Sequence, residues 1–155
     1  MTRVLRALIV DDDPFAADML STRLRQQLPT LDIETVDRPE PRSGHDVYLI
    51  DNDFGGIKLG TRLAKSLRAT NPESLIVAFS GTLDATTLKE LLNAGCNGAC
   101  EKGQERDLSV LIELVKRFSE TQQKAQEDRG IGSVLRSLGD LLKQWNKRLD
   151  RLETK

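Results

Sequence analysis

The chain has 155 residues, 38% of them hydrophobic and 30% charged, which is the composition of a soluble globular protein long enough to bury a core. Lys and Arg total 23 against 24 for Asp and Glu, so the formal net charge of -1 gives no overall attraction to nucleic acid or to a membrane. The apolar run near the N-terminus is too short for a signal peptide, and acidic residues follow it at once. We therefore expect a cytoplasmic protein.

The N-terminal part predicts a strand, a helix and a second strand. Residues 6–10 form a continuous apolar run, as in a parallel sheet that is covered on both faces. Pro14 suits the first turn of a helix capped by Asp12 or Asp13, and Pro29 ends it. Apolar residues at helical spacing predict its buried stripe: Phe15, Met19, Leu20, Leu24 and Leu28. Residues 31–36 alternate between apolar and polar, which predicts a strand at or near a sheet edge.

The connection between the second and third strands, residues 37–45, is unusual. Pro39 and Pro41 exclude an ordinary helix interior there. A crossover between parallel strands usually needs a dozen or more residues, including a helix. The sequence therefore predicts a shortened second crossover. His45 at its end has no evident partner, and we expect this side chain at the surface.

The rest of the first 120 residues alternates between strands and helices. Apolar runs at 47–50, 74–79 and 99–100 predict strands, and helical patterns lie at 59–67, 84–95 and 108–118. This alternation predicts an α/β fold, a doubly wound five-stranded parallel sheet with helices on both faces. Cys96 and Cys100 have no His nearby to complete a zinc site, so we expect two reduced, partly buried thiols.

Residues 121–155 differ from this domain and predict a polar linker followed by an extra C-terminal amphipathic helix that Ser133 opens. Three heptads are too short to be stable alone in water, so this helix either pairs with a second copy or folds back. We expect a homodimer, or docking over the sheet face left bare by the short second crossover. The basic outer face of the helix indicates solvation, and no helix-turn-helix fits in it. The apolar residues have coiled-coil spacing: Leu135, Leu138, Leu142, Trp145, Leu149 and Leu152.

Polar residues follow four of the predicted strands. Asp11 and Asp12 follow the first, Asp51 the third, Ser80 the fourth and Lys102 the fifth. Ligands of such sheets bind beyond the carboxyl ends of the strands, so we expect these side chains to meet at one edge.

This set of side chains suits phosphoryl transfer. Clustered carboxylates repel one another unless they share a proton or a cation, and Asp11, Asp12 and Asp51 offer the all-oxygen site that suits Mg²⁺. An ionised Asp51 is a nucleophile toward phosphorus and gives an acyl phosphate. Lys102 supplies positive charge for the phosphoryl oxygens, and Ser80 supplies a hydrogen-bond donor.

Together these residues resemble the receiver domains of two-component response regulators, over about residues 6–118. The resemblance implies strand order 2-1-3-4-5 and phosphorylation of Asp51 by a sensor histidine kinase or a phosphotransfer protein. It also implies Mg²⁺ held by Asp12, Asp51 and the backbone carbonyl of Asp53, with Asp11 contributing indirectly. Ser80 and Lys102 would carry the switch.

Three positions depart from the pattern of that family. Gly55 and Gly103 replace prolines that are common there, and Ala99 replaces the aromatic residue that usually rotates during switching. Asp53 lies two positions beyond Asp51, where its charge could repel phosphate or water. We therefore expect slower or altered turnover of the phosphate.

Our leading interpretation is a signalling switch whose output is protein binding, with no enzymatic activity beyond its own phosphorylation and dephosphorylation. One alternative is a phosphate-independent pseudo-receiver that serves as a scaffold. The other is a haloacid-dehalogenase-like phosphatase, because residues 51–53 form its DxD pattern. That family needs a further acidic pair after the Lys, and only Glu105 and Asp107 are available.

Overall fold

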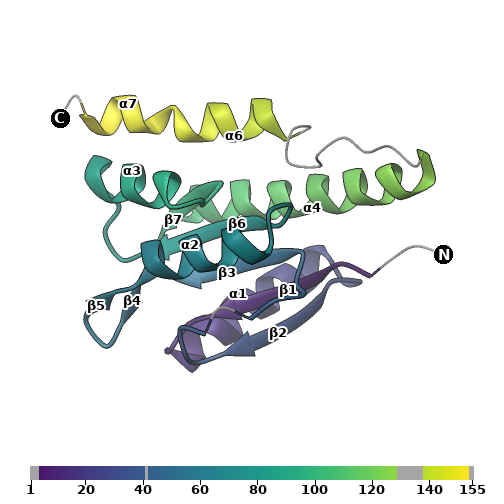
Figure 1. Ribbon diagram of the computed structural model, residues 1–155, viewed down its shortest axis with the longest axis horizontal. Helices are drawn as coiled ribbons and strands as arrows, with labels where there is room; N and C mark the ends of the chain where they lie inside the picture. Colours follow the sequence, from purple (N-terminus) through teal and green to yellow (C-terminus); the bar gives the residue numbers. More distant parts are fainter. Residues whose placement is uncertain (1–3, 41, 129–137, 154–155) are drawn as a thin grey trace.

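The computed structural model describes residues 4–40, 42–128 and 138–153, and its centre is a parallel β-sheet (Figure 1). The sheet has five strands in the order β2-β1-β3-β6-β7. This is the predicted order 2-1-3-4-5 when the sheet strands are counted along the chain. The strands are β1 (Arg6–Val10), β2 (Asp32–Val36), β3 (Val47–Asp51), β6 (Leu75–Ser80) and β7 (Gly98–Glu101).

Helices cover both faces of this sheet, which confirms the doubly wound α/β architecture. α1 (Pro14–Gln27) and α4 (Glu105–Asp128) share one hydrophobic cluster with the sheet, and α2 (Gly60–Thr70) and α3 (Ala85–Asn93) share another. Successive side chains of a strand point to opposite faces, so β1 gives Ile9 to the first cluster and Leu8 to the second. No helix among the described residues has both the length and the apolar character needed to cross a bilayer.

Helix α1 begins as predicted but buries a different face. The Asp13 side chain accepts a hydrogen bond from the backbone N–H of Phe15 and caps the helix. Its buried residues are Ala17, Ser21 and Leu24. Phe15 is 71% exposed and Met19 55% exposed, so the prediction that both are buried was wrong. Leu20, Leu24 and Leu28 of the predicted stripe do pack on the sheet, with Ala17 and Ser21 beside them.

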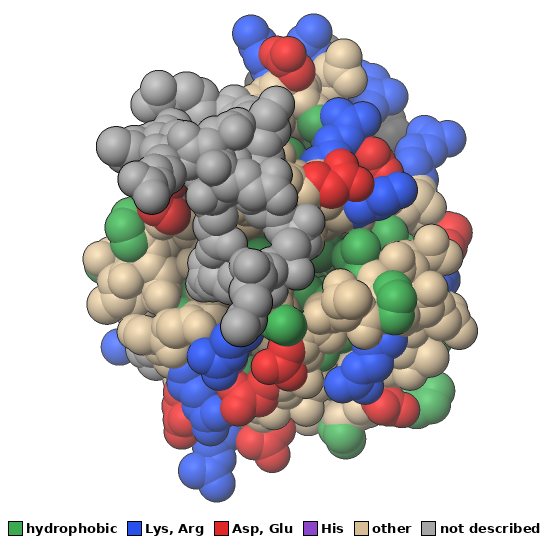
Figure 2. All heavy atoms as spheres, turned by 90° about the vertical axis from the view of Figure 1, so that its right-hand side faces the viewer, with side chains coloured by type: hydrophobic (Ala, Val, Ile, Leu, Met, Phe, Trp, Pro, Cys, Tyr) green, Lys and Arg blue, Asp and Glu red, His purple; other side chains and the backbone are tan. Residues whose placement is uncertain are grey.

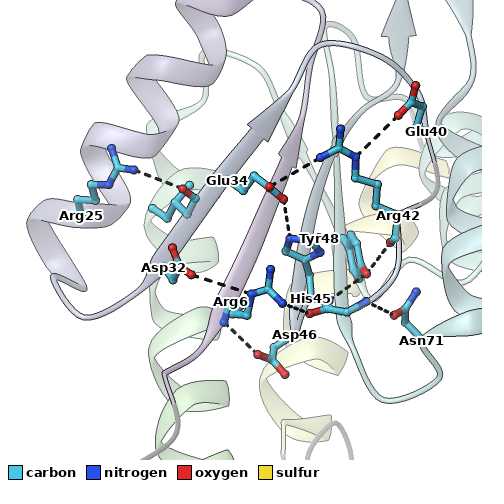
Figure 3. A network of polar contacts seen from close by, with 12 residues as sticks. Arg6, Arg25, Asp32, Glu34, Glu40, Arg42, His45, Asp46, Tyr48 and Asn71 are labelled. Atoms are coloured by element: carbon cyan, nitrogen blue, oxygen red, sulfur yellow. Dashed lines mark hydrogen bonds and ion pairs between the residues drawn. The ribbon is translucent and has the colours of Figure 1, made fainter.

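The second crossover contains no helix among its described residues, as predicted, and its polar side chains form a network with those of β2 and β3 (Figure 3). Nε2 of His45 lies 3.0 Å from Oε2 of Glu34 on β2. The Tyr48 hydroxyl donates to the backbone carbonyl of Arg42 at 2.7 Å, and Arg42 also pairs with Glu34. The side chain of His45 is only 4% exposed, so its predicted surface position was wrong. A strand carboxylate under the loop gives the imidazole its partner.

A short antiparallel hairpin directly after β3 was not predicted. It consists of β4 (Asp53–Phe54) and β5 (Ile57–Lys58), and Gly55 and Gly56 form its turn with φ of 58° and 85°. Such left-handed backbone angles favour glycine, so the Gly pair allows the chain to reverse here.

The C-terminal part of the chain folds back onto the sheet domain. α4 continues to Asp128, through the predicted linker that begins at residue 121. α6 (Gly139–Asn146) and α7 (Arg148–Glu153) then run beside β7 and α3 (Figure 1). Residues 133–137, with the predicted helix start and Leu135, lie outside the described residues. We refer to residues 138–153 as the C-terminal segment.

The C-terminal segment packs at the β7 edge, whereas the short second crossover follows β2 at the opposite edge. The prediction that the segment docks over the sheet face left bare by this crossover was therefore wrong. Leu138 is 2% exposed and Trp145 8% exposed, both in the cluster shared with α4. Leu149 and Leu152 pack against the cluster shared with α3. The predicted seam, where it is described, is thus used within the chain.

Candidate functional site

Three carboxylates converge at the carboxyl edge of the sheet. β1 and β3 are parallel neighbours with Val10 opposite Ile50, so the residues that follow them emerge side by side. One carboxylate oxygen from each of Asp11, Asp12 and Asp51 lies within 4.8 Å of the others. The predicted convergence of these acids is confirmed.

The burial of this cluster perturbs one of its members. Burial raises the pKa of Asp11 to about 6. The backbone N–H of Asp13, which donates a hydrogen bond to Oδ1 of Asp11 at 2.9 Å, lowers this pKa and so opposes part of the rise. The negative charge of Asp51 adds to the rise. Asp51 itself is only 2% exposed. The negative charges of the clustered carboxylates therefore repel one another, which favours the binding of either a shared proton or a cation.

The three acids fit a magnesium ion. Each is a hard oxygen donor, and together they form the carboxylate set that Mg²⁺ binds in proteins. Burial raises the pKa of Asp11 most, the negative charge of Asp51 adds to the rise, and a divalent cation bound between the carboxylates would oppose both effects. Asp11, Asp12 and Asp51 are the side chains that would hold it.

Lys102 is the cation of the site. Its Nζ lies 2.9 Å from Oδ1 of Asp51. Burial alone would lower the pKa of Lys102, but the hydrogen bond and the charge of Asp51 outweigh this, so the pKa is raised. The ammonium group therefore stays charged beside the carboxylate. As predicted, the residues after β3 and β7 are brought together.

Ser80 ends β6 and is fully buried. Its hydroxyl donates to the carbonyl of Thr82 at 2.8 Å, and its own carbonyl accepts from the backbone N–H of Lys102 at 2.8 Å. Phe79, just before it, is opposite Asp51 in the sheet. Ser80 thus lies at the same edge as the acids, with its hydroxyl bound to its own loop.

The structure places the side chain of Asp53 outside the acidic cluster. Its carboxylate lies 3.1 Å from Nζ of Lys58, its partner across the β4–β5 hairpin. Its backbone N–H donates to Oδ1 of Asp51 at 3.1 Å. The role predicted for Asp53, which is to hold Mg²⁺ through its backbone carbonyl, stays a prediction.

Sequence reasoning missed the residues that shape the site from the hairpin. The backbone N–H of Gly55 donates to Oδ2 of Asp12 at 3.1 Å and holds that carboxylate in place. Asn52 is buried, and its Oδ1 accepts from the backbone N–H of Gly60 at 3.0 Å. A Cβ at residue 60 would lie 2.4 Å from this oxygen, so only glycine fits there. A Gly at the start of a helix is the signal that could have revealed this contact.

Glu105 and Asp107, the acidic pair that a phosphatase would need, are bound elsewhere. Glu105 pairs with Arg23 of α1, and Asp107 pairs with Arg148 of α7 at 2.6 Å. Neither belongs to the acidic cluster that the described residues form. The geometry therefore disfavours the haloacid-dehalogenase-like alternative.

A comparison with protein-family models finds no match for this sequence, and a comparison with curated proteins finds none either. Solved structures do match. The signal receiver domain of a DNA-binding response regulator (merR) from Colwellia psychrerythraea 34H has 21% identity and a TM-score of 0.66, over 75% of this chain and 98% of that one. A CheY-like response regulator receiver domain protein from Methanospirillum hungatei JF-1 has 21% identity and a TM-score of 0.65, over 79% and 98%.

A third similar structure is the response regulator TrrA from Thermotoga maritima, solved in complex with Mg²⁺ and a beryllium fluoride. It has 22% sequence identity to this chain and a TM-score of 0.59, over 72% of this chain and 96% of that one. In all three comparisons the match extends over nearly the whole of the solved receiver structure. This protein therefore has the fold of response regulator receiver domains, as the sequence resemblance predicted.

Proposed function

We propose that this chain is a phosphorylation-dependent signalling switch, which accepts a phosphoryl group on Asp51 and signals by binding other proteins. The phosphodonor would be a histidine kinase or a phosphotransfer protein, and Mg²⁺ would be the cofactor. One observation carries the proposal: Asp51 lies within reach of two further acids and of the Lys102 ammonium group, at the ligand edge of a receiver fold.

The chemistry follows from the contacts of Asp51. Lys102 and the backbone N–H of Asp53 both donate to Oδ1, which leaves Oδ2 as the attacking atom. Oδ2 forms a bond to phosphorus as the phosphorus–nitrogen bond of the donor breaks; the electron pair of that bond stays on the imidazole nitrogen, which then takes a proton from water. Lys102 stabilises the charge on the phosphoryl oxygens. Bound Mg²⁺ would neutralise the charge of those oxygens and of the carboxylates.

Loss of the phosphoryl group closes the cycle. Water adds to phosphorus, the bond to Oδ2 breaks, and inorganic phosphate leaves with Asp51 restored. The Asp53 carboxylate is 34% exposed, is paired with Lys58 and lies two positions beyond Asp51. We propose that this ion pair alters the rate of turnover, since it places a carboxylate and an ammonium group beside the phosphate.

A donor protein has a suitable surface beside Lys102. A cavity of about 270 Å³ opens between α1 and the start of α4, lined in part by Leu20, Phe79 and Lys102. The exposed side chains of Phe15 and Met19 lie one helical turn apart on α1, and Met19 also lines this cavity. Exposed apolar side chains around a polar mouth suit a protein partner.

The charge distribution supports output to a protein. On the face shown in Figure 2, Lys and Arg side chains are interspersed with Asp and Glu among the coloured atoms. This mixture agrees with the formal net charge of -1. Nucleic-acid binding would require a continuous basic surface.

The proposal is tested by incubating the full chain with acetyl phosphate and Mg²⁺ and measuring its intact mass. We expect the mass of one phosphoryl group to be added to the wild type and none to Asp51→Asn. A wild type that gains no mass would support the pseudo-receiver alternative. Steady turnover of a generic phosphate monoester would support the phosphatase alternative.

Homodimerisation through the C-terminal helix remains a prediction. Leu138 and Trp145 of the predicted seam are buried against this chain's own sheet domain. A dimer that uses them therefore requires the C-terminal segment to leave that surface first. Sedimentation of the full chain over a range of concentrations, with and without acetyl phosphate and Mg²⁺, measures this directly.

A further inference from the structure

The C-terminal segment covers the open edge of the sheet by a close fit. β7 has a neighbouring strand, β6, on one side only. Trp145 packs on the α4 face of β7, so closely against Gly98 that a Cβ there would lie 2.2 Å from Cζ3 of the indole ring. Nδ2 of Asn146 donates to the carbonyl of Asn97 at 2.9 Å. Side chains of the segment thus bind a strand edge that would otherwise be unpaired.

One half-buried ion pair attaches this segment to the domain. Nη1 of Arg148 donates to Oδ1 of Asp107 at 2.6 Å, and Nη2 of Arg148 donates to the carbonyl of Ala99. The guanidinium group also lies 4.5 Å from the centre of the Trp145 ring. The two side chains of the ion pair are 12% and 14% exposed. Removing one partner of such a pair leaves an uncompensated charge away from water.

The same carboxylate is bound to the last residue of β7, directly before Lys102. The other oxygen of Asp107, Oδ2, accepts from the backbone N–H of Glu101 at 2.9 Å. The side chain of Glu101 accepts from the backbone N–H of Leu83 at 2.9 Å, in the loop that follows Ser80. Glu101 therefore links the candidate site to the attachment of the segment. It is the neighbour of Lys102 in the chain, and its side chain binds the loop that follows Ser80.

We propose that the C-terminal segment is a releasable cover of the β7 edge, and that phosphorylation of Asp51 weakens its attachment through Glu101 and Asp107. This inference rests on the proposed function, because it needs a phosphoryl group on Asp51. It goes beyond it by naming the element that moves.

The direction of the effect follows from the donors around Asp51. A phosphoryl group adds negative charge and three acceptor oxygens, which attract the Lys102 ammonium group and the Ser80 hydroxyl. To reach them, Ser80 must give up its bond to the Thr82 carbonyl, and this displaces the loop that contains Leu83. The Glu101 contacts shift with it. The hydrogen bond between Asp107 and Arg148 is then lost, and a half-buried guanidinium without its carboxylate is more stable in water.

Trp145 is the only tryptophan of the chain and lies in the contact, so its fluorescence reports docking. The experiment adds beryllium fluoride and Mg²⁺ to the full chain, as a stable stand-in for the phosphoryl group, and measures acrylamide quenching of Trp145. We expect quenching to rise at least about twofold and the emission to shift to the red, because release exposes the indole. Asp51→Asn should show neither change.

A matched pair of variants tests the attachment without phosphorylation. Arg148→Gln removes the ion pair with Asp107, and we expect it to raise Trp145 quenching in the absence of beryllium fluoride. Lys147→Gln removes an exposed positive charge from the adjacent position and should leave quenching unchanged. Circular dichroism of both variants shows whether the sheet domain is still folded.

The outcomes separate this inference from the proposed function. Intact mass after treatment with acetyl phosphate reports first whether Asp51 accepts a phosphoryl group. If it does, and Trp145 quenching is unchanged by acetyl phosphate and by beryllium fluoride, the cover does not respond to Asp51 and the inference is overturned. If no mass is added, the proposed function is wrong, and the inference that rests on it is overturned with it.

Discussion

Nζ of Lys102 lies 2.9 Å from Oδ1 of Asp51, and this ion pair reaches across the end of β6 to join β7 to the central strand β3. The Lys102 side chain is 34% exposed and that of Asp51 2% exposed. The pair therefore lies at the floor of the site, where an incoming phosphoryl group would meet a buried nucleophile and a fixed cation together.

Removal of this cation should slow phosphoryl transfer. We expect Lys102→Met to gain mass from acetyl phosphate about 100-fold more slowly than the wild type, because a preorganised charge donor is lost. Lys89→Met, which changes an exposed Lys on α3, should behave as the wild type does. Equal rates for the two variants would show that Lys102 takes no part in the transfer.

The affinity for Mg²⁺ should depend on pH through Asp11, whose pKa of about 6 in the folded chain is raised above its value of 3.8 in a model peptide. Below about pH 6 this carboxyl holds a proton that must leave before the cation binds. We therefore expect the affinity, measured by titration calorimetry, to fall by up to about tenfold per pH unit below that point and to level off above it. The Asp11→Asn variant should bind more weakly and lose most of this pH dependence.

Gly98→Ala should disturb the C-terminal segment, since the new methyl group would overlap the Trp145 ring. We expect the free energy of unfolding in urea to fall by about 1–3 kcal/mol and Trp145 quenching to rise. Gly139→Ala is the matched control, because a Cβ at residue 139 meets no atom within 4 Å. A stability of Gly98→Ala equal to that of this control would contradict the close packing described here.

Asn52→Ala should weaken the hairpin beside the site. The backbone N–H of Gly60 would lose its acceptor in a buried place, at a cost of about 1–3 kcal/mol in the free energy of unfolding. The same change at the exposed Asn93 should have little effect. Because β4 and β5 also hold Asp12 through Gly55, we further expect Asn52→Ala to bind Mg²⁺ more weakly.

The two sides of α1 should respond differently to truncation. Leu24 is fully buried, and Leu24→Ala should lower the free energy of unfolding by about 2–5 kcal/mol. Met19 is 55% exposed, and Met19→Ala should change it by less than about 0.5 kcal/mol. Urea denaturation of both variants checks the corrected orientation of this helix.

The fold and the main side chains of the candidate site could be predicted because both depend on where apolar runs end. A carboxylate after β1 and another after β3 must emerge together once the strands are parallel neighbours, and Lys102 after β7 follows the same rule. Right-handed crossovers alone leave several strand orders open, and it was the resemblance to receiver domains that implied the order 2-1-3-4-5.

Contacts between side chains that lie far apart in the sequence could not be predicted in this way. His45 was expected at the surface because its partner, Glu34, belongs to another element. Likewise, the periodicity of the C-terminal helix shows that its apolar face needs a partner but not which one. The segment packs at β7 because Trp145 fits against Gly98 and because Arg148 pairs with Asp107, which lies in the first turn of α4.

The cover of β7 also has a consequence for biosynthesis. The two residues joined there, Asn97 and Asn146, are 49 positions apart, so the strand leaves the ribosome well before the helix that protects it. At roughly 5–20 residues per second, the nascent chain shows a bare strand for about 2–10 seconds. During that interval the strand can pair with a neighbouring polypeptide, and the newborn protein is most prone to aggregate or to need a chaperone.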